Sequence, residues 1–409
     1  MRGPQFFLLV FIPFALGHFL SSLLRGVNAV LAPDLMAALS LNAVHLGLLT
    51  SAFFLAFALI QLPVGIALDR HGPRKVQLVL MMVAAVGTFM FARSSSFGEM
   101  MLARALMGAG LGGCFMSAVK AISSTIAPAK LPSVHGYMIA VGGLGAATST
   151  MPVRLALDFT DWRGLFTVMA ALVACIGLLI WLAAPRTPVA PRASMPVWQS
   201  LAAVYRDPAF RRITSLLLIP HAVFFGVQGL WIGRWLTDVS RFSDGAVAYL
   251  LYLSMAAVIF GAIFVGMVTE WAAKRGISAI DVGAIGVALF VLVQLAIVFN
   301  YRPSLPMLSV MFTLVGTITG IEYALVAQSM PASLTGRAST CLNLLIFLGA
   351  FVVQAGFGQV LRLFAPNAGG QYPVLAYQVA FAVLVLVQLP GLLRYGALRL
   401  RSSGAAFAG

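Results

Sequence analysis

Two segments with the same arrangement of residues lie about half a chain apart, GIALDRHGPRK at 65–75 and GMVTEWAAKRG at 266–276. Each begins with a glycine at the end of a long apolar run, carries an acid four residues later, and continues through basic residues to a second glycine. Because the chain has 409 residues, this spacing indicates one structural unit present twice. In both copies a charged loop would follow a membrane-length helix.

The composition shows what kind of unit this is. Hydrophobic residues make up 61% of the chain and charged residues 9%, which excludes an ordinary soluble protein. About 20 helical residues cross a bilayer core of roughly 30 Å, and runs of that length recur along the sequence. We therefore predict an all-α integral membrane protein with twelve transmembrane helices. The expected helices are 6–32, 46–68, 76–92, 101–124, 134–156, 163–184, 213–237, 246–268, 280–299, 307–329, 338–361 and 376–396.

The distribution of charge predicts the orientation. With twelve spans that start inside, most Lys and Arg fall in cytoplasmic loops, as the positive-inside rule requires. The net charge of +15 therefore indicates a multi-pass membrane protein, with both termini cytoplasmic and the lipid bilayer, not nucleic acid, as its partner. The run 6–32 is too long for a signal peptide and no small-residue cleavage site follows it, so we interpret it as the first helix.

A connector divides the chain into two halves. Residues 186–212 are the longest non-apolar stretch, rich in proline and basic residues, and predict a flexible cytoplasmic connector with a short interfacial helix around Val197–Tyr205. The division leaves an N-terminal six-helix bundle at 1–185 and a C-terminal six-helix bundle at 213–409. Within the helices, His18 lies 203 residues before His221, and Lys120 lies 202 before Glu322. These spacings support two pseudo-symmetric halves.

Several motifs resemble the major facilitator superfamily of secondary transporters over essentially the whole chain. The loop 65–75 resembles that family's cytoplasmic signature between its second and third helices. Arg104, Gly108 and Gly110 resemble the signature of its fourth helix, and Trp162-Arg163 with Phe166 resemble a common start of its sixth. The segments FALIQLPVGIALDRHGPRK and VQGLWIGRWLTDV are further similar to a proteobacterial branch that includes amino-acid and siderophore carriers. The resemblance implies a fold of two six-helix bundles that works by alternating access.

The resemblance also implies a cytoplasmic gate. In the family, the acid at the position of Asp69 meets the start of the eleventh helix, here near Ala338, across the interface between the halves. A carboxylate near a helix N-terminus is favoured by about 0.3–1 kcal/mol, and neighbouring arginines can add charged hydrogen bonds. The alternative is a solvated basic loop without a gate role. The second copy has Glu270 and extra residues, so we expect it to matter less. The gate residues we expect are Gly65, Asp69, Arg70, Gly72, Arg74, Lys75, Glu270 and Arg337.

Pairs of glycines four residues apart predict close helix packing. Gly108 and Gly112 form one GxxxG pair, and Gly316 and Gly320 form another at the matching place in the second half. Small residues at this spacing let helices approach closely in lipid, where packing replaces the hydrophobic effect. Cys114, Cys175 and Cys341 lie inside apolar runs at no metal or redox spacing, so we interpret them as packing residues and expect no metal site and no cofactor.

Polar residues follow one face of each of several expected helices. A charged group in a membrane helix costs about 2.5–3.5 kcal/mol on insertion scales, so it needs a partner or a wet cavity. In the family, the first, fourth, seventh, tenth and eleventh helices line a central cavity. The cavity residues we expect are His18, Ser22, Arg25, Asn28, Ser117, Lys120, His221, Gln228, Trp231, Glu322, Asn343 and Gln354. For each the alternative is a structural role: Arg25 could reach the interface, Arg104 could brace the fold, and Asn343 and Gln354 could bond to neighbouring helices.

Lys120 and Glu322 form the sharpest pair. Their pseudo-symmetric positions predict that they approach each other when the cytoplasmic side closes, so that the pair breaks and forms during transport. The competing hypothesis gives substrate binding to Lys120 and proton transfer to Glu322.

These residues lead to three functional hypotheses. The excess of cavity cations favours a substrate with an anionic group, and His18, His221 and Glu322 are candidate proton carriers. The first hypothesis is proton-coupled uptake of an organic anion or amino acid by a monomer. The second is efflux of a siderophore or drug, and the third is a transport-like sensor. No nucleotide loop or nucleophile–base pair is evident, so we expect no enzyme.

Overall fold

The computed structural model describes residues 3–126, 131–185, 196–299, 304–331, 334–367 and 369–407, and every regular element in these ranges is a helix. Residues 186–195 of the predicted connector lie outside the described residues. The predicted interfacial helix is present as α10 (Val197–Arg206), and Trp198 on it is 79% exposed.

In the described part of the first half there are ten helical segments. They are α1 (Gly3–Phe6), the π-helix η1 (Phe7–Phe11), α2 (Ile12–Gly26), α3 (Asn28–Leu39), α4 (Ala43–Arg93), α5 (Phe97–Leu111), α6 (Cys114–Ser123), α7 (Leu131–Thr148), α8 (Met151–Ala156) and α9 (Trp162–Ala183).

The second half, after α10, follows a similar order. Its segments are α11 (Pro208–Gly226), the π-helix η3 (Val227–Trp231), α12 (Ile232–Ser240), α13 (Asp244–Ala273), α14 (Ala279–Phe299), α15 (Leu305–Gly316), the 3₁₀-helix η5 (Thr317–Gly320), α16 (Ile321–Ser329), α17 (Thr335–Arg362) and α18 (Val374–Phe407).

These segments account for the twelve predicted membrane helices. Among the described residues, ten helices are long and apolar enough to cross a bilayer. One of them, α4, has 51 residues and contains two predicted spans. The remaining predicted span, 134–156, corresponds to α7 and α8. Helices satisfy their backbone hydrogen bonds internally, which lipid requires of any spanning segment. The prediction of an all-α membrane fold is therefore confirmed.

The two loops that define the sequence repeat each contain a glycine with a positive φ. At Gly72, inside α4, φ is 74° and the helix reverses direction, and at Gly276, after α13, φ is 75°. A side chain is strained at such positive φ values, so glycine suits both turns. The repeat seen in the residues is thus also a repeat in backbone geometry.

The helices that carry most of the expected cavity residues are interrupted at matching places. The first membrane helix breaks at Val27, between α2 and α3, and its counterpart in the second half contains η3. The fourth breaks at residues 112–113, between α5 and α6, and its counterpart passes through η5. Glycines and π-turns weaken a helix locally, and such breaks in membrane proteins line cavities or hinges.

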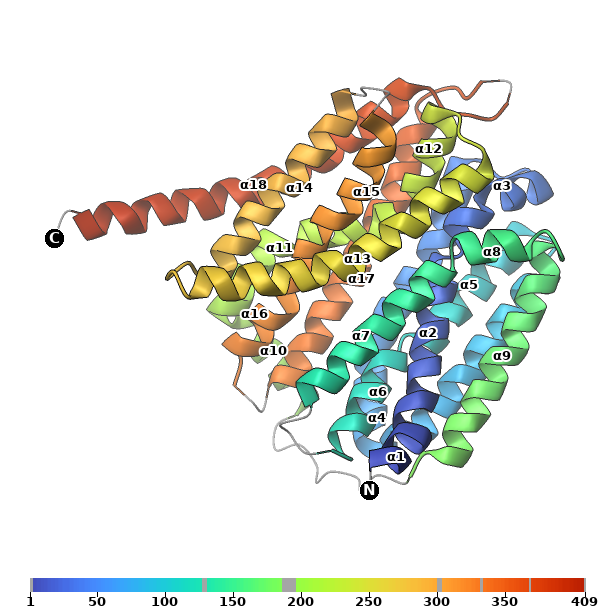
Figure 1. Ribbon diagram of the computed structural model, residues 1–409, viewed down its shortest axis with the longest axis horizontal. Coiled ribbons are helices and arrows are strands. Elements are labelled where there is room, and N and C mark those ends of the chain that lie inside the picture. Colours follow the sequence, from blue (N-terminus) through green and yellow to red (C-terminus); the bar gives the residue numbers. More distant parts are fainter. Residues whose placement is uncertain are drawn as a thin grey trace.

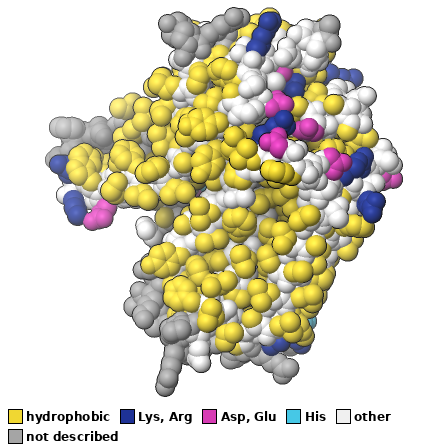
Figure 2. Space-filling view, turned by 45° about the vertical axis from the view of Figure 1, so that its right-hand side comes forward, with side chains coloured by type: hydrophobic (Ala, Val, Ile, Leu, Met, Phe, Trp, Pro, Cys, Tyr) yellow, Lys and Arg dark blue, Asp and Glu magenta, His cyan; other side chains and the backbone are white. Residues whose placement is uncertain are grey.

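Two groups of helices lie side by side in Figure 1, the first half at the lower right and the second at the upper left. Within the first half α4 packs on α5 and α9, and within the second α11 packs on α17 and α13 on α15. The halves meet mainly where α4 contacts α17 and where α7 contacts α13. Hydrophobic side chains cover the middle of the face seen in Figure 2 and charges gather towards its ends, as expected for a lipid-facing surface.

The two GxxxG pairs differ in how closely other parts of the chain pack against their glycines. A Cβ on Gly108 would lie 2.2 Å from the carbonyl oxygen of Phe53, and one on Gly112 would lie 2.6 Å from Ile60, so α5 packs closely on α4 as predicted. A Cβ on Gly316 would lie 2.4 Å from the Phe224 ring. Gly320 has no neighbouring atom within 4 Å of such a Cβ. The packing prediction is therefore wrong for Gly320, which lies in η5 instead of in a helix contact.

Candidate transport site

We name the two ends of the molecule by the orientation that the charges predict. The inner end carries α10 and the turn at Gly72, and the outer end carries residues 40–42 and 369–373. Between them, the cavity helices of the two halves face each other.

The two halves are in contact at the outer end. The backbone N–H of Ala43, the first residue of α4, donates to the Tyr372 hydroxyl at 3.4 Å. A Cβ on Gly47 would lie 3.2 Å from the Gln354 carbonyl oxygen, and one on Gly233 would lie 3.2 Å from that of Ala29. Close backbone approaches between the halves therefore close this end.

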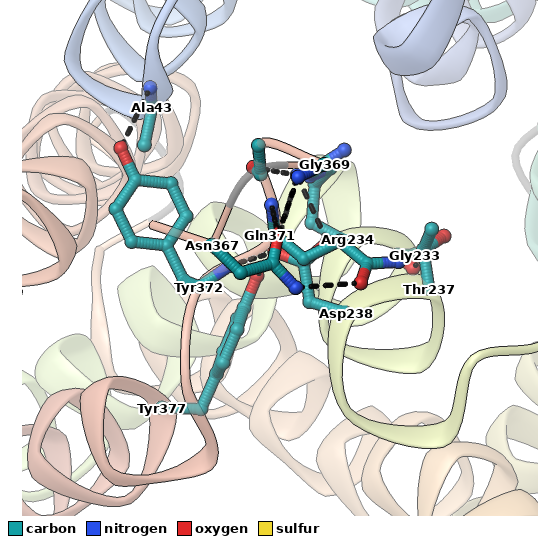
Figure 3. A network of polar contacts seen from close by, with 11 residues as sticks. Ala43, Gly233, Arg234, Thr237, Asp238, Asn367, Gly369, Gln371, Tyr372 and Tyr377 are labelled. Atoms are coloured by element: carbon teal, nitrogen blue, oxygen red, sulfur yellow. Dashed lines mark hydrogen bonds and ion pairs between the residues drawn. The ribbon is translucent and has the colours of Figure 1, made fainter. Parts of the chain in front are cut away.

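A buried network holds Tyr372 in place (Figure 3). Arg234 forms an ion pair with Asp238 at 2.9 Å, with both side chains on α12. Asp238 also accepts hydrogen bonds from the Tyr377 hydroxyl at 2.7 Å and from the Tyr372 N–H at 3.2 Å. We did not predict this network from the sequence. The signal for it was an acid four residues after an arginine at the end of a membrane helix.

At the inner end, none of the described ion pairs joins the two halves; each pair lies inside a single half. Asp69 pairs with Lys120, and Glu270 pairs with Lys274 at 2.8 Å. Arg337, at the start of α17, donates to the Ser200 hydroxyl of α10. The predicted meeting of Asp69 with α17, and of Lys120 with Glu322, concerns a state whose inner end is closed, and both stay predictions.

The remaining gate residues surround the turn at Gly72. Arg70 and Lys75 are exposed, and a Cβ on Gly65 would have no neighbouring atom within 4 Å. The Arg74 guanidinium lies 4.6 Å from the centre of the Trp181 ring on α9. These residues therefore form a solvated basic surface around the Asp69–Lys120 pair.

Arg25 is the cation that faces the opposite half in the middle of the molecule. Its guanidinium lies 5.5 Å from the centre of the Phe225 ring on α11, and one of its nitrogens lies 3.5 Å from the Ser22 hydroxyl. It also interacts electrostatically with Tyr323 on α16. Among the described residues, none of the ion pairs includes Arg25. A half-buried arginine without an acid partner suits an anionic ligand.

Behind Phe225 lies a buried pair. Nδ1 of His221 is 3.0 Å from Oε2 of Glu322, and both side chains are almost completely buried. The His221 ring stacks on Phe225 with 5.3 Å between centres and meets the edge of Tyr323 at 5.7 Å. Oε1 of Glu322 has no hydrogen-bond partner. This pair can hold or release a proton away from bulk water.

Tyr323 connects this pair to Asn343. Its hydroxyl donates to the Asn343 side-chain oxygen, which brings α16 and α17 together beside Arg25. We expected Asn343 in the cavity, whereas Tyr323 was not predicted. The sequence feature that could have identified Tyr323 as a site residue is its position next to Glu322, on a helix with few other aromatic residues.

Four other expected cavity residues bond to groups within their own half. Asn28 donates to the Thr50 hydroxyl at 3.2 Å, and the Gln228 side-chain oxygen accepts from Thr313 at 2.6 Å. The Trp231 indole N–H donates to the Gln354 carbonyl oxygen at 2.9 Å, and the Gln354 amide donates to the Gly226 carbonyl at 3.2 Å.

His18 and Ser117 lie on helices that face each other in the first half. The His18 ring is 5.1 Å from the Phe115 ring on α6, and its Nδ1 has no hydrogen-bond partner. The buried Ser117 hydroxyl also lacks a partner. His18 is half-buried, so it can accept or donate a hydrogen bond towards a ligand.

Arg104 is fully buried on α5. It donates to the Leu24 carbonyl at 3.0 Å, and its guanidinium lies 5.0 Å from the centre of the Phe53 ring. Two of its nitrogens have no partner. Arg104 therefore holds α5 against α2 at Leu24, the residue before Arg25.

Comparison with known proteins identifies the family. The family model described as "Major Facilitator Superfamily" matches residues 14–354, which is most of the chain. The chain belongs to the major facilitator superfamily. It is a multi-pass membrane transporter of small solutes and not an enzyme.

Curated relatives of this superfamily member carry sugars and organic anions. It is 29% identical over 154 residues to a probable sulfoacetate transporter of Cupriavidus necator, a match that covers 38% of this chain and 36% of that relative. It is 23% identical over 397 residues to a glucose transporter of Staphylococcus epidermidis, covering 93% of this chain and 84% of the relative. A probable L-galactonate transporter of Escherichia coli is 26% identical over 291 residues, covering 67% and 63%. The finer resemblance to amino-acid and siderophore carriers stays a prediction.

Solved structures of transporters have the same fold as this superfamily member. A bacterial homolog of the human lysosomal transporter Spinster, in an inward-facing and unoccupied conformation, aligns with a TM-score of 0.76 at 17% identity over 97% of both chains. The nucleoside transporter NupG aligns with a TM-score of 0.71 at 16% identity over 94% of this chain and 98% of that one. Among the residues that the structure describes, no group of three potential metal ligands occurs.

Proposed function

We propose that this transporter moves a small organic anion together with protons across the bacterial inner membrane, in the direction of uptake, by alternating access. The observation that carries the proposal is Arg25, a cation that faces the opposite half beside the buried His221–Glu322 pair.

The charge on Arg25 supports an anionic substrate. A cation inside the membrane is costly unless an opposite charge or water compensates it, and no described acid pairs with Arg25. Glu322, an acid on α16, pairs with His221 instead. A carboxylate, sulfonate or similar group on the substrate would complete the charge balance. Sulfoacetate and L-galactonate, which two of the relatives are named for, are anions of this kind.

The His221–Glu322 pair supports proton coupling. Adding a proton to the pair changes its charge in a place that water does not reach, and such a change is expensive unless another charge compensates it. Phe225 contacts both His221 and Arg25, and Tyr323 meets the His221 ring and interacts electrostatically with Arg25. Binding of an anion at Arg25 and binding of a proton behind these rings would therefore favour each other.

Contacts that differ between the two ends of the molecule support alternating access. The halves are joined at the outer end through Ala43 and Tyr372, whereas the described inner ion pairs stay within one half. In the opposite state, Asp69 would leave Lys120 for the start of α17, and Lys120 would be free to approach Glu322. The matched breaks in the cavity helices provide places where such a movement can bend the chain.

Efflux of a siderophore or drug-like molecule is the second hypothesis, favoured by the aromatic rings beside Arg25. One relative is named as a probable sugar efflux transporter, of Helicobacter pylori, and another as a putative multidrug resistance protein, of Salmonella. A sensor that binds without transport is the third hypothesis.

Counterflow in proteoliposomes tests these hypotheses. Vesicles holding the purified chain are loaded with labelled monocarboxylates and sulfonates, and exchange is measured with and without a pH gradient. We expect Arg25→Gln to abolish exchange, and Glu322→Gln to keep exchange but to lose accumulation driven by the gradient. Asp158→Asn, which changes an exposed acid outside the expected gate and cavity, is the matched control. Gradient-driven accumulation that survives in both Glu322→Gln and His221→Gln would exclude this pair as the proton site, and wild-type vesicles that exchange no anion would exclude anion transport.

A further inference from the structure

Arginines of two helices, α11 and α18, lie at the same level near the inner end. Arg212 on α11 and Arg394 on α18 are both exposed. The two helices touch further out, where a Cβ on Gly391 would lie 2.4 Å from the Ser215 carbonyl oxygen. Each arginine is three residues from this contact towards the inner end, which is about 4.5 Å along a helix. The two cations therefore belong to one region of the membrane surface.

The Tyr395 ring connects the helices in this region. Tyr395 is buried, and the Arg212 guanidinium lies 5.8 Å from the centre of its ring. The Tyr395 hydroxyl donates to Asp281, in the first turn of α14, at 2.6 Å. The cation–π contact holds the guanidinium in place but supplies no full negative charge. Arg212 is thus positioned without being neutralised.

The acids of the adjoining segments are bound to other groups. Asp281 pairs with Arg399, and Asp207 caps the N-terminus of α11. None of the ion pairs among the described residues includes Arg212 or Arg394. Two cations from different helices therefore have no described acid partner.

The surroundings of these cations are those of a membrane interface. Leu393 on α18 and Ile219 on α11 are 68% and 41% exposed, so hydrocarbon covers the surface beside the arginines. Trp198 is exposed on α10, which packs on α11, and exposed tryptophans are typical of the level of lipid headgroups. The end of α18 continues beyond the rest of the second half (Figure 1). An arginine at this level can reach a headgroup while its stem lies along hydrocarbon.

We propose that Arg212 and Arg394 bind the phosphate of an anionic phospholipid, such as phosphatidylglycerol, at the inner end. Guanidinium groups bind phosphate oxygens through charge-assisted hydrogen bonds, and basic pockets between membrane helices bind acidic headgroups. A zwitterionic lipid would fit less well, because its own cation repels the arginines. One arginine comes from each helix, so the bound phosphate would link α11 to α18. This lipid site is separate from the transport site and does not depend on the transported substrate.

Lipid retention by the full chain tests the proposal. The purified chain in dodecyl maltoside micelles receives equal amounts of phosphatidylglycerol and phosphatidylcholine with the same acyl chains, and native mass spectrometry counts the lipids that stay bound. We expect phosphatidylglycerol to be favoured by at least about tenfold. Inorganic phosphate at the same concentration should not displace it, because it has no acyl chain to lie beside Leu393. Equal retention of the two lipids, or displacement by inorganic phosphate, would overturn the proposal.

Substitutions locate the bound lipid. Arg212→Gln and Arg394→Gln should each lower the preference for phosphatidylglycerol by about three- to tenfold, and the double variant should remove it. Arg275→Gln is the matched control, because Arg275 is also exposed and its guanidinium lies 3.8 Å from the centre of the Trp271 ring. It removes the same charge and should keep the preference. An equal loss in the control would mean that net charge attracts the lipid, and a preference kept by the double variant would place the lipid elsewhere. Either result would overturn the assignment.

Melting curves provide a second measurement. Both arginines are exposed, so without phosphatidylglycerol the double variant should unfold at the wild-type temperature. Added phosphatidylglycerol should raise the melting temperature of the wild type and of Arg275→Gln, and not that of the double variant. An equal rise in the double variant would contradict the proposal. The comparison of the two lipids on the wild-type chain stands even if a variant fails to fold.

Discussion

Nδ1 of His221 lies 3.0 Å from Oε2 of Glu322, although the two residues are 101 positions apart and belong to different membrane helices. Both side chains are buried, so neither can exchange its partner for water without a rearrangement. The pair therefore fixes how α11 and α16 pack, as well as being the proposed proton site.

The first prediction concerns the stability of this pair. His221→Leu should destabilise the protein by about 3–5 kcal/mol, because it leaves the Glu322 carboxyl buried without a partner. The double variant His221→Leu/Glu322→Leu should lose less than the sum of the single changes, with a coupling energy of about 0.5–3 kcal/mol. The free energies of unfolding of the wild type, the two single variants and the double variant, measured by reversible unfolding in mixed detergent micelles, give this coupling energy. Additive single changes would show that the two groups do not interact.

The second prediction concerns the inner gate. Asp69→Asn should slow or abolish transport while membrane insertion and thermal stability stay normal. The Asp69–Lys120 pair has side chains that are 62% and 31% exposed, so its loss should cost at most about 1 kcal/mol of stability. The role of Asp69 would then lie in another conformational state. Transport assays paired with melting curves test this, with Asp158→Asn, at an exposed acid outside the gate, as the control. Full transport by Asp69→Asn would refute the gate.

The third prediction concerns the outer contact. Tyr372→Phe removes the hydroxyl that accepts the Ala43 N–H and keeps the ring, so the outer end should open more often. A net hydrogen bond contributes about 0.5–1.5 kcal/mol, which corresponds to a shift in population of about two- to tenfold. Electron-spin distance measurements between labels at positions 40 and 369 report the opening. Tyr395→Phe, whose hydroxyl donates to Asp281 at the inner end, should leave this distance unchanged.

The fourth prediction compares two glycines. Gly108→Ala should destabilise the protein by about 1–3 kcal/mol, because its Cβ would lie 2.2 Å from the Phe53 carbonyl oxygen and force α5 away from α4. Gly320→Ala should change stability by no more than about 0.5 kcal/mol, because no atom lies near the new methyl group. Melting temperatures in one detergent provide the comparison. Equal effects would mean that the close packing of α5 is not what Gly108 provides.

The matched loops and helix lengths could be predicted because lipid imposes a local rule. Each spanning segment must satisfy its own backbone hydrogen bonds, so about 20 apolar residues in a row are enough to place a helix. The turns at Gly72 and Gly276 were also evident from the residues, and both have the positive φ that glycine tolerates best. The GxxxG pattern fails to predict helix packing at Gly320. Two glycines four residues apart describe the surface of one helix, but they do not show whether a second helix packs against that surface.

The partners of the polar residues were decided by the tertiary structure alone. Sequence spacing places His18, Arg25 and Asn28 on one helix face, yet the break at Val27 lies between Arg25 and Asn28, and Asn28 turns to Thr50. The same spacing could not tell that Glu322 would meet His221 or that Lys120 would meet Asp69. The sequence by itself determined a membrane protein of two related halves with a charged turn in each. The contacts across helices determined which charged side chains of the described residues have a partner of opposite charge. A helix pattern gives only the direction of a side chain, whereas packing decides which atom it reaches.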